Sequence, residues 1–64
     1  MKISIEAARV NAGLTLRDAA KELGVSVSTI SGYENGKTNP SFDIIQKMAI
    51  LYNWPIECLR VGKE

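Results

Sequence analysis

The side chains best suited to bind another molecule lie between Thr15 and Lys37, in the stretch TLRDAAKELGVSVSTISGYENGK. Arg17 and Lys37 stand near its two ends, and cations of this kind pair with phosphate groups. Between them, Val27 and Ser28 are small. A serine hydroxyl bonds the edges of most bases, and an aliphatic side chain contacts the methyl group of thymine. Cations on either side of a small-residue face are suited to the surface of a DNA duplex.

Polar residues and glycines in this stretch predict two short helices joined by one sharp turn. Thr15 is a good N-cap, and Asp18, three residues later, can complete a capping box. Gly24 supplies the left-handed conformation that closes the first helix, and Ser26 caps the second. The dipeptide Asn35-Gly36 then ends the second helix with a turn signal.

The apolar residues of both helices recur at helical spacing and therefore define the inner faces. They are Leu16, Ala19, Ala20 and Leu23 in the first helix, and Ile30 and Tyr33 in the second. Ala20 must be small, because the two helices touch there. The second helix then has small outward side chains, and a helix of this kind fits the major groove of DNA.

These features resemble the helix-turn-helix of phage repressors and Cro proteins, the XRE-like family. Its pattern of a small residue, a glycine four later and an aliphatic residue six beyond is met by Ala20, Gly24 and Ile30. The segment YENGKTNPS, residues 33–41, is similar to the family's link out of its recognition helix. The resemblance covers about residues 4–60. It implies an all-α, compact five-helix fold, one domain over residues 1–64, a helix-turn-helix unit at about 16–34 and a recognition helix at about 27–34.

Three further helices are expected around this unit. Ser4 caps a first helix over residues 5–11, and Ser41 caps the strongly apolar helix over residues 42–52. Asn53 stops that helix, and Pro55 is suited to the first turn of a final helix over residues 55–60. The sequence contains no alternating pattern typical of a strand.

The composition excludes several other classes of protein. The 64 residues include one cysteine, Cys58, and no histidine, so we expect no disulfide within the monomer, no zinc cluster and no metal. Cys58 lacks a base to activate it, and we expect neither an enzyme nor a cofactor. No apolar run reaches the length of a membrane span, and no signal peptide is visible, so a reducing cytoplasm fits.

The resemblance also implies roles for individual residues. It places the base-reading positions at Val27, Ser28, Ser31 and Gly32, and the phosphate contacts at Leu16 through its backbone amide, Arg17, Thr29 and Lys37. It pairs Arg9 of the first helix with Glu34 at the end of the recognition helix. The implied function is that of a small DNA-binding transcriptional regulator of phage or mobile-element origin, with double-stranded DNA as its partner.

Two features leave a second function open. Many family members carry a glutamine at the position of Leu16, and the net charge of +1 is low for a DNA-binding protein. Leu16 either turns inward beside Ala19 or joins Val27 and Gly32 in an apolar, weakly charged surface. Such a surface suits an antirepressor, which docks on another repressor protein and blocks its binding to DNA.

Residues near the C-terminus also allow two interpretations. Trp54, Cys58, Leu59 and Val61 either pack into the core or form the two-fold interface of a homodimer. In the second case the spacing of two half-sites on DNA would be about 34 Å.

Overall fold

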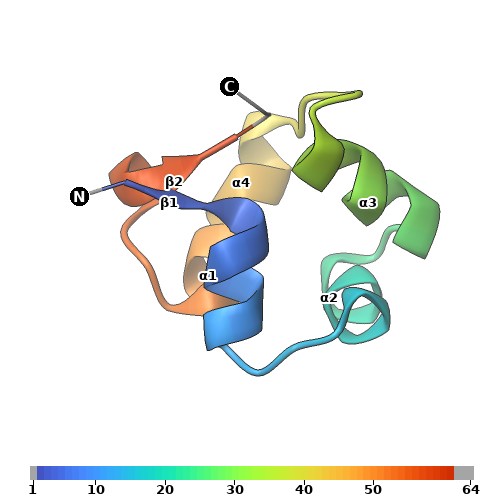
Figure 1. Ribbon diagram of the computed structural model, residues 1–64, viewed down its shortest axis with the longest axis horizontal. Coiled ribbons are helices and arrows are strands. Elements are labelled where there is room, and N and C mark those ends of the chain that lie inside the picture. The colour runs from blue at the N-terminus through green and yellow to red at the C-terminus, as the bar shows by residue number, and fades with distance from the viewer. Residues whose placement is uncertain (1, 62–64) are drawn as a thin grey trace.

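The computed structural model describes residues 2–61, and helices dominate it (Figure 1). In chain order the elements are β1 (Ile3–Ser4), α1 (Ile5–Asn11), α2 (Leu16–Leu23), α3 (Val27–Asn35), α4 (Phe42–Tyr52), a 3-10 turn η1 (Ile56–Cys58) and β2 (Leu59–Arg60). In Figure 1, α2 and α3 lie at one end of the molecule and the two strands at the opposite end. None of the helices in this part of the chain is long and apolar enough to cross a membrane.

Each α-helix begins after a hydroxyl side chain that accepts a hydrogen bond from a backbone amide three residues later. The four N-caps are Ser4, Thr15, Ser26 and Ser41. A cap of this kind stabilises a helix by about 1 kcal/mol. Left-handed residues end the three later helices, namely Gly24 (φ 74°), Gly36 (φ 78°) and Asn53 (φ 61°). These local signals explain why the predicted bounds of the four helices agree with the structure.

The expected fifth helix is wrong, and so is the expectation that the chain forms no strand. Residues 56–58 make only one 3-10 turn, closed by a hydrogen bond of 2.9 Å from the Cys58 amide to the Pro55 carbonyl. Pro55 is extended (φ −59°, ψ 139°) and does not start an α-helix. The chain then pairs in parallel with β1, Ile3 beside Leu59. The fold is therefore mostly helical, with four α-helices in residues 2–61 and one small pair of strands.

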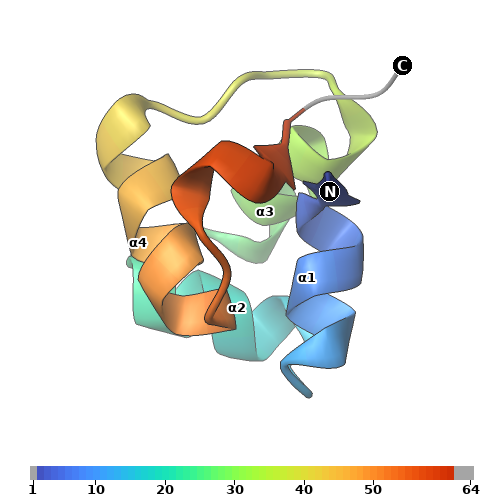
Figure 2. The same ribbon diagram turned by 90° about the vertical axis from the view of Figure 1, so that its left-hand side faces the viewer.

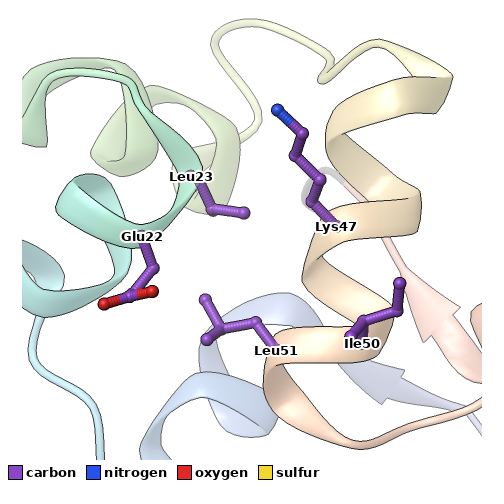
Figure 3. Close-up of a pocket in the computed structure, with 5 residues that line it drawn as sticks. All are labelled: Glu22, Leu23, Lys47, Ile50 and Leu51. Atoms are coloured by element: carbon purple, nitrogen blue, oxygen red, sulfur yellow. The ribbon is translucent and has the colours of Figure 1, made fainter.

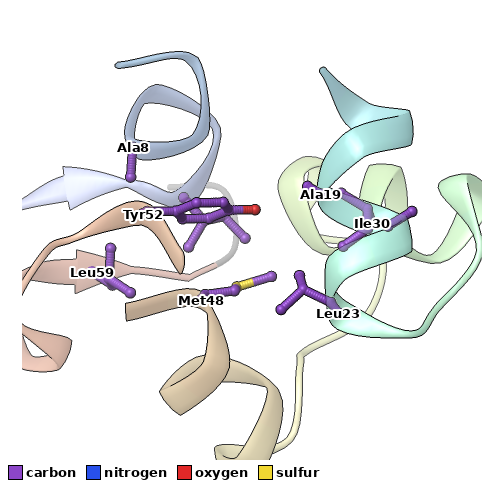
Figure 4. Close-up of a cluster of buried hydrophobic side chains, with 9 residues drawn as sticks. Ala8, Ala19, Leu23, Ile30, Met48, Tyr52 and Leu59 are labelled. Atoms are coloured by element: carbon purple, nitrogen blue, oxygen red, sulfur yellow. The ribbon is translucent and has the colours of Figure 1, made fainter. Parts of the chain in front are cut away.

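The hydrophobic core joins the four α-helices and the strand pair. Figure 4 shows side chains of α1, α2, α3, α4 and β2 pointing toward one another. Ile30 of α3 and Met48 of α4 are completely buried, and Leu59 of β2 is buried in the same cluster. Figure 2 shows the segment of η1 and β2 passing over the space between α1 and α4. Burial of Leu59 and pairing with β1 together favour the extended backbone over a helix in this segment.

Candidate nucleic-acid interface

The turn between α2 and α3 sets the relation of the two helices. Ala19 and Ala20 of α2 are buried, and both belong to the core that α2 shares with α3. The Val25 amide donates to the carbonyl of Ala20 at 3.0 Å across the left-handed Gly24. Hydrogen bonds of this type satisfy the last carbonyls of a helix and fix its exit direction. The turn is thus defined by the backbone itself.

The first turn of α3 projects two side chains into solvent. Val27 is 40% exposed, and Ser28 is exposed beside it. Thr29 is half-buried, and its hydroxyl lies 2.8 Å from that of Ser26, whose oxygen also accepts from the Thr29 amide at 3.1 Å. Ile30 anchors the opposite face in the core. Val27 and Ser28 therefore form the most accessible part of the predicted base-reading face.

The second half of α3 is less accessible than the sequence indicated. Ser31 is half-buried, and its hydroxyl accepts a hydrogen bond of 3.3 Å from the exposed Asn35 amide. Gly32 lies under the following loop: its carbonyl accepts from the Lys37 amide at 2.9 Å, and a Cβ there would lie 3.3 Å from the Thr38 hydroxyl oxygen. Gly32 thus allows the loop to approach α3, and it is half-buried; its role as a base-reading position stays a prediction.

The cations and the start of α2 provide the groups for binding phosphate. Arg17 and Lys37 are exposed, whereas Leu16 is half-buried and packs against the core. Within residues 2–61 the amides of Leu16 and Arg17 have no hydrogen-bond partner, and such amides at a helix N-terminus attract anions. Asp18 opposes this attraction, because it carries a negative charge beside these amides. The Thr15 amide donates to the Asp18 carboxylate at 3.2 Å, and this hydrogen bond lowers the pKa of Asp18.

A buried ion pair fixes the far end of α3. Nε of Arg9 donates to Oε2 of Glu34 at 2.7 Å and Nη2 donates to Oε1 at 3.3 Å, while Nη1 donates to the Leu14 carbonyl at 2.8 Å. The two side chains expose only 10% and 7% of their surface. The hydrogen bond to Glu34 raises the pKa of Arg9 above its usual value. One guanidinium thus joins α1, the α1–α2 link and the last turn of α3.

Tyr52 of α4 lies next to this pair. The sequence predicted the pair but did not indicate this position of Tyr52. Its ring is buried, and its hydroxyl has no hydrogen-bond partner within the described residues. Burial, assisted by the negative charge of Glu34, raises the pKa of Tyr52 to about 12. The contact of Arg9 with the Leu14 carbonyl was also not predicted from the sequence, because every residue type has a backbone carbonyl that can accept such a hydrogen bond.

The predicted dimer interface near the C-terminus does not form one exposed patch. Leu59 is buried in the core, and Trp54 is half-buried and packs against it. Cys58 is half-buried, and Val61 is 37% exposed. Leu59 is therefore a core residue of the single chain, as the first of the two interpretations expects, and the homodimer interface at the remaining residues stays a prediction.

The chain matches a family of known proteins over most of its length. The model of the helix-turn-helix family covers residues 5–57, which contain α2, α3 and the turn between them. The chain therefore belongs to this family of XRE-type helix-turn-helix proteins.

Several curated relatives are transcriptional regulators by name. The chain is 38% identical to the HTH-type transcriptional regulator DdrOP3 of Deinococcus deserti, over 88% of this chain and 43% of that protein. It is 39% identical to an uncharacterized HTH-type transcriptional regulator of Archaeoglobus fulgidus, over 92% and 84% of the two chains. ImmR of Bacillus subtilis is 33% identical over 94% of this chain and 46% of its own length. The chain thus spans less than half of DdrOP3 and ImmR. No solved structure gives a significant match.

Proposed function

We propose that this protein regulates transcription by binding double-stranded operator DNA in the cytoplasm. In this proposal α3 enters the major groove, where Val27 and Ser28 meet the base edges. Arg17, Lys37 and the free amides at the start of α2 bind the phosphates on either side. An origin in a phage or mobile element, which the family resemblance implies, belongs to the same proposal.

The observation that carries the proposal is the way α3 is held. Ile30 fixes it to the core, and the Arg9–Glu34 pair fixes its last turn, while Val27 and Ser28 at its first turn stay exposed. A recognition helix must be held rigidly on its inner side and stay accessible on its outer side, because side chains that are not fixed in position discriminate poorly between bases. The membership in a family of helix-turn-helix transcriptional regulators supports the same function.

The side chains exposed at the first turn of α3 determine how tightly we expect one copy to bind DNA. The described residues place no Arg, Gln or Asn at the first turn of α3, so the bidentate contacts that are worth about 1–3 kcal/mol each are absent there. With a net charge of +1, one copy also has a weak general attraction to DNA. We therefore expect tight binding only where two copies, or a copy and a partner, occupy adjacent sites.

A gel shift with DNA upstream of the neighbouring genes tests the proposal. We expect binding by the unaltered protein and a strong loss with Lys37→Ala and with Val27→Asp. Lys2→Ala is the matched control, because Lys2 is exposed and its ammonium donates to the Glu57 carbonyl at 3.1 Å, in η1 and not in α2 or α3. Loss of binding with Lys2→Ala equal to that with Lys37→Ala would contradict the proposed surface.

The exposed Val27 supports a second candidate function. An apolar residue 40% exposed at the first position of α3 suits a protein surface as well as a thymine methyl group. In this case the protein is an antirepressor that docks on another repressor. The same gel shift, repeated with a repressor encoded nearby, separates the two: an antirepressor does not shift DNA by itself and removes the shift of the repressor. Val27→Asp would then abolish the effect, and Lys37→Ala would leave it unchanged.

A further inference from the structure

The last residue of α3, Asn35, is followed by Gly36, and these two residues can react with each other. The carbon Cγ of an asparagine amide is electrophilic, and the backbone nitrogen of the next residue can attack it. A glycine at that next position has no Cβ to hinder the attack. Asn35 is the one asparagine of the sequence that precedes a glycine.

The structure leaves this pair of residues accessible. Asn35 and Gly36 are exposed, and the Asn35 amide donates a hydrogen bond of 3.3 Å to the Ser31 hydroxyl. The Gly36 amide is shared between the carbonyls of Gly32 and Tyr33. Its distance of 3.4 Å to the Tyr33 oxygen is longer than the usual value of about 2.7–3.2 Å. Because helix ends fray, opening of this turn frees the Gly36 nitrogen beside the Asn35 side chain.

We propose that Asn35 is a site of spontaneous deamidation, which converts it to aspartate or isoaspartate. The Gly36 nitrogen gives its proton to solvent and bonds to Cγ of Asn35. The bond from Cγ to Nδ2 breaks, and Nδ2 takes a proton from water and leaves as ammonia. Water then adds to one carbonyl carbon of the resulting cyclic imide and opens the ring to a carboxylate. The sum is one water consumed and one ammonia released, with no oxidation or reduction.

Both products weaken the proposed contact of Lys37 with phosphate, and this consequence rests on the proposed function. The Cα atoms of Asn35 and Lys37 lie within about 7 Å of each other, because two residues separate no further. That is within the screening length of about 8 Å at physiological salt, so the new carboxylate reduces the attraction of Lys37 for DNA. Isoaspartate also adds a methylene group to the backbone before Gly36. The bond of 2.9 Å from the Lys37 amide to the Gly32 carbonyl depends on that backbone.

DNA binding and deamidation oppose each other. A duplex bound to α3 stabilises the closed last turn, and a ligand that binds the closed form lowers the population of the open form. The modification therefore accumulates in copies that are free of DNA. Since it is irreversible, it removes those copies from the population able to bind.

Peptide mass spectrometry of the intact protein, incubated without DNA in mildly alkaline buffer, tests the modification. We expect Asn35 to lose its amide while the other asparagines keep theirs. Asn11, Asn39 and Asn53 are internal controls, because all three are exposed and are followed by alanine, proline and tryptophan. The variant Asn35→Gln should show no conversion at this position, since its amide is one methylene further from the attacking nitrogen. Retention of the Asn35 amide for as long as the other three would overturn the proposal.

Fluorescence anisotropy with an operator duplex tests the consequence. Asn35→Asp should bind more weakly, with a slope of log affinity against log salt that is smaller by about 1. Asn53→Asp adds the same charge at the end of α4 and should leave the slope unchanged. The duplex should also slow the amide loss of the unaltered protein. Equal slopes for the two variants, or equal rates with and without bound duplex, would overturn the opposition to DNA binding. If the fresh protein binds no DNA, the proposed function fails, whereas the amide loss is measured without DNA.

Discussion

Removing one member of the Arg9–Glu34 pair should destabilise the protein far more than removing both. The pair is largely buried and joined by two hydrogen bonds, so Arg9→Met leaves the Glu34 carboxylate buried without its partner. The expected cost is about 3–5 kcal/mol. The free energy of unfolding of a 64-residue domain is roughly 3–10 kcal/mol in total. The single change therefore takes away much of the stability, and Glu34→Leu should act in the same way.

The double variant Arg9→Met with Glu34→Leu replaces both charges by apolar side chains of similar size. We expect it to lie within about 2 kcal/mol of the unaltered protein, since only the Leu14 carbonyl loses a donor. Urea unfolding followed by circular dichroism gives the four free energies of the cycle, and the coupling energy should be at least about 2 kcal/mol. Arg17→Met, at an exposed cation, is the control and should change stability by less than about 0.5 kcal/mol. Single changes that each cost less than about 1 kcal/mol and simply add would refute the reasoning.

Three further substitutions test other parts of the structure, each by urea unfolding. Tyr52→Phe should be neutral or slightly stabilising at pH 7, because the buried hydroxyl has no partner in residues 2–61. Folding raises the pKa of Tyr52 from 10.0 to about 12, so the folded state keeps the phenol proton to a higher pH. The stability that this group contributes is complete below pH 10 and is lost as the pH rises to about 12. Tyr52→Phe should remove that part of the pH dependence of the free energy of unfolding. Gly24→Ala should cost about 1–2 kcal/mol from backbone strain alone, because φ is 74° and the added Cβ meets no atom within 4 Å. Leu59→Ala should lower the free energy of unfolding by about 2–4 kcal/mol, because Leu59 is buried in the core. A change near zero would contradict the core position of Leu59.

The helices were predictable because their signals are local. The hydroxyl residues Ser4, Thr15, Ser26 and Ser41 each cap a helix through an amide three residues later, and the glycine at position 24 ends α2. Such contacts depend on residues that are neighbours in the sequence, so their types and spacing are enough to indicate them.

The end of the chain was not predictable in the same way. A proline such as Pro55 is compatible both with the start of a helix and with an extended chain. The extended conformation is selected by the pairing of Leu59 with Ile3, which is distant in the sequence. Two paired residues are too few to show an alternating pattern. The partial cover of Gly32 was not predictable for a similar reason, because it depends on the contacts of the following loop at Lys37 and Thr38.

A small groove between α2 and α4, which Figure 3 shows, left one signal in the sequence. Ile50 is apolar but lies off the inward stripe of α4, whose buried members are Met48 and Tyr52. An apolar residue outside the buried face of a helix is either a contact with another molecule or an ordinary exposed side chain, and both give the same sequence pattern. The structure adds the hollow beside it and the opposite charges of Glu22 and Lys47.

The salt dependence of DNA affinity tests the central claim, that the outer face of α3 and the cations beside it bind DNA. Fluorescence anisotropy with an operator duplex gives the dissociation constant over a range of salt concentrations. We predict a steep decrease of affinity with salt, and a slope of log affinity against log salt that is smaller by about 1 for Lys37→Ala and for Arg17→Ala. Lys2→Ala should leave the slope unchanged. Binding with no dependence on salt, or equal slopes for all of these variants, would contradict the account.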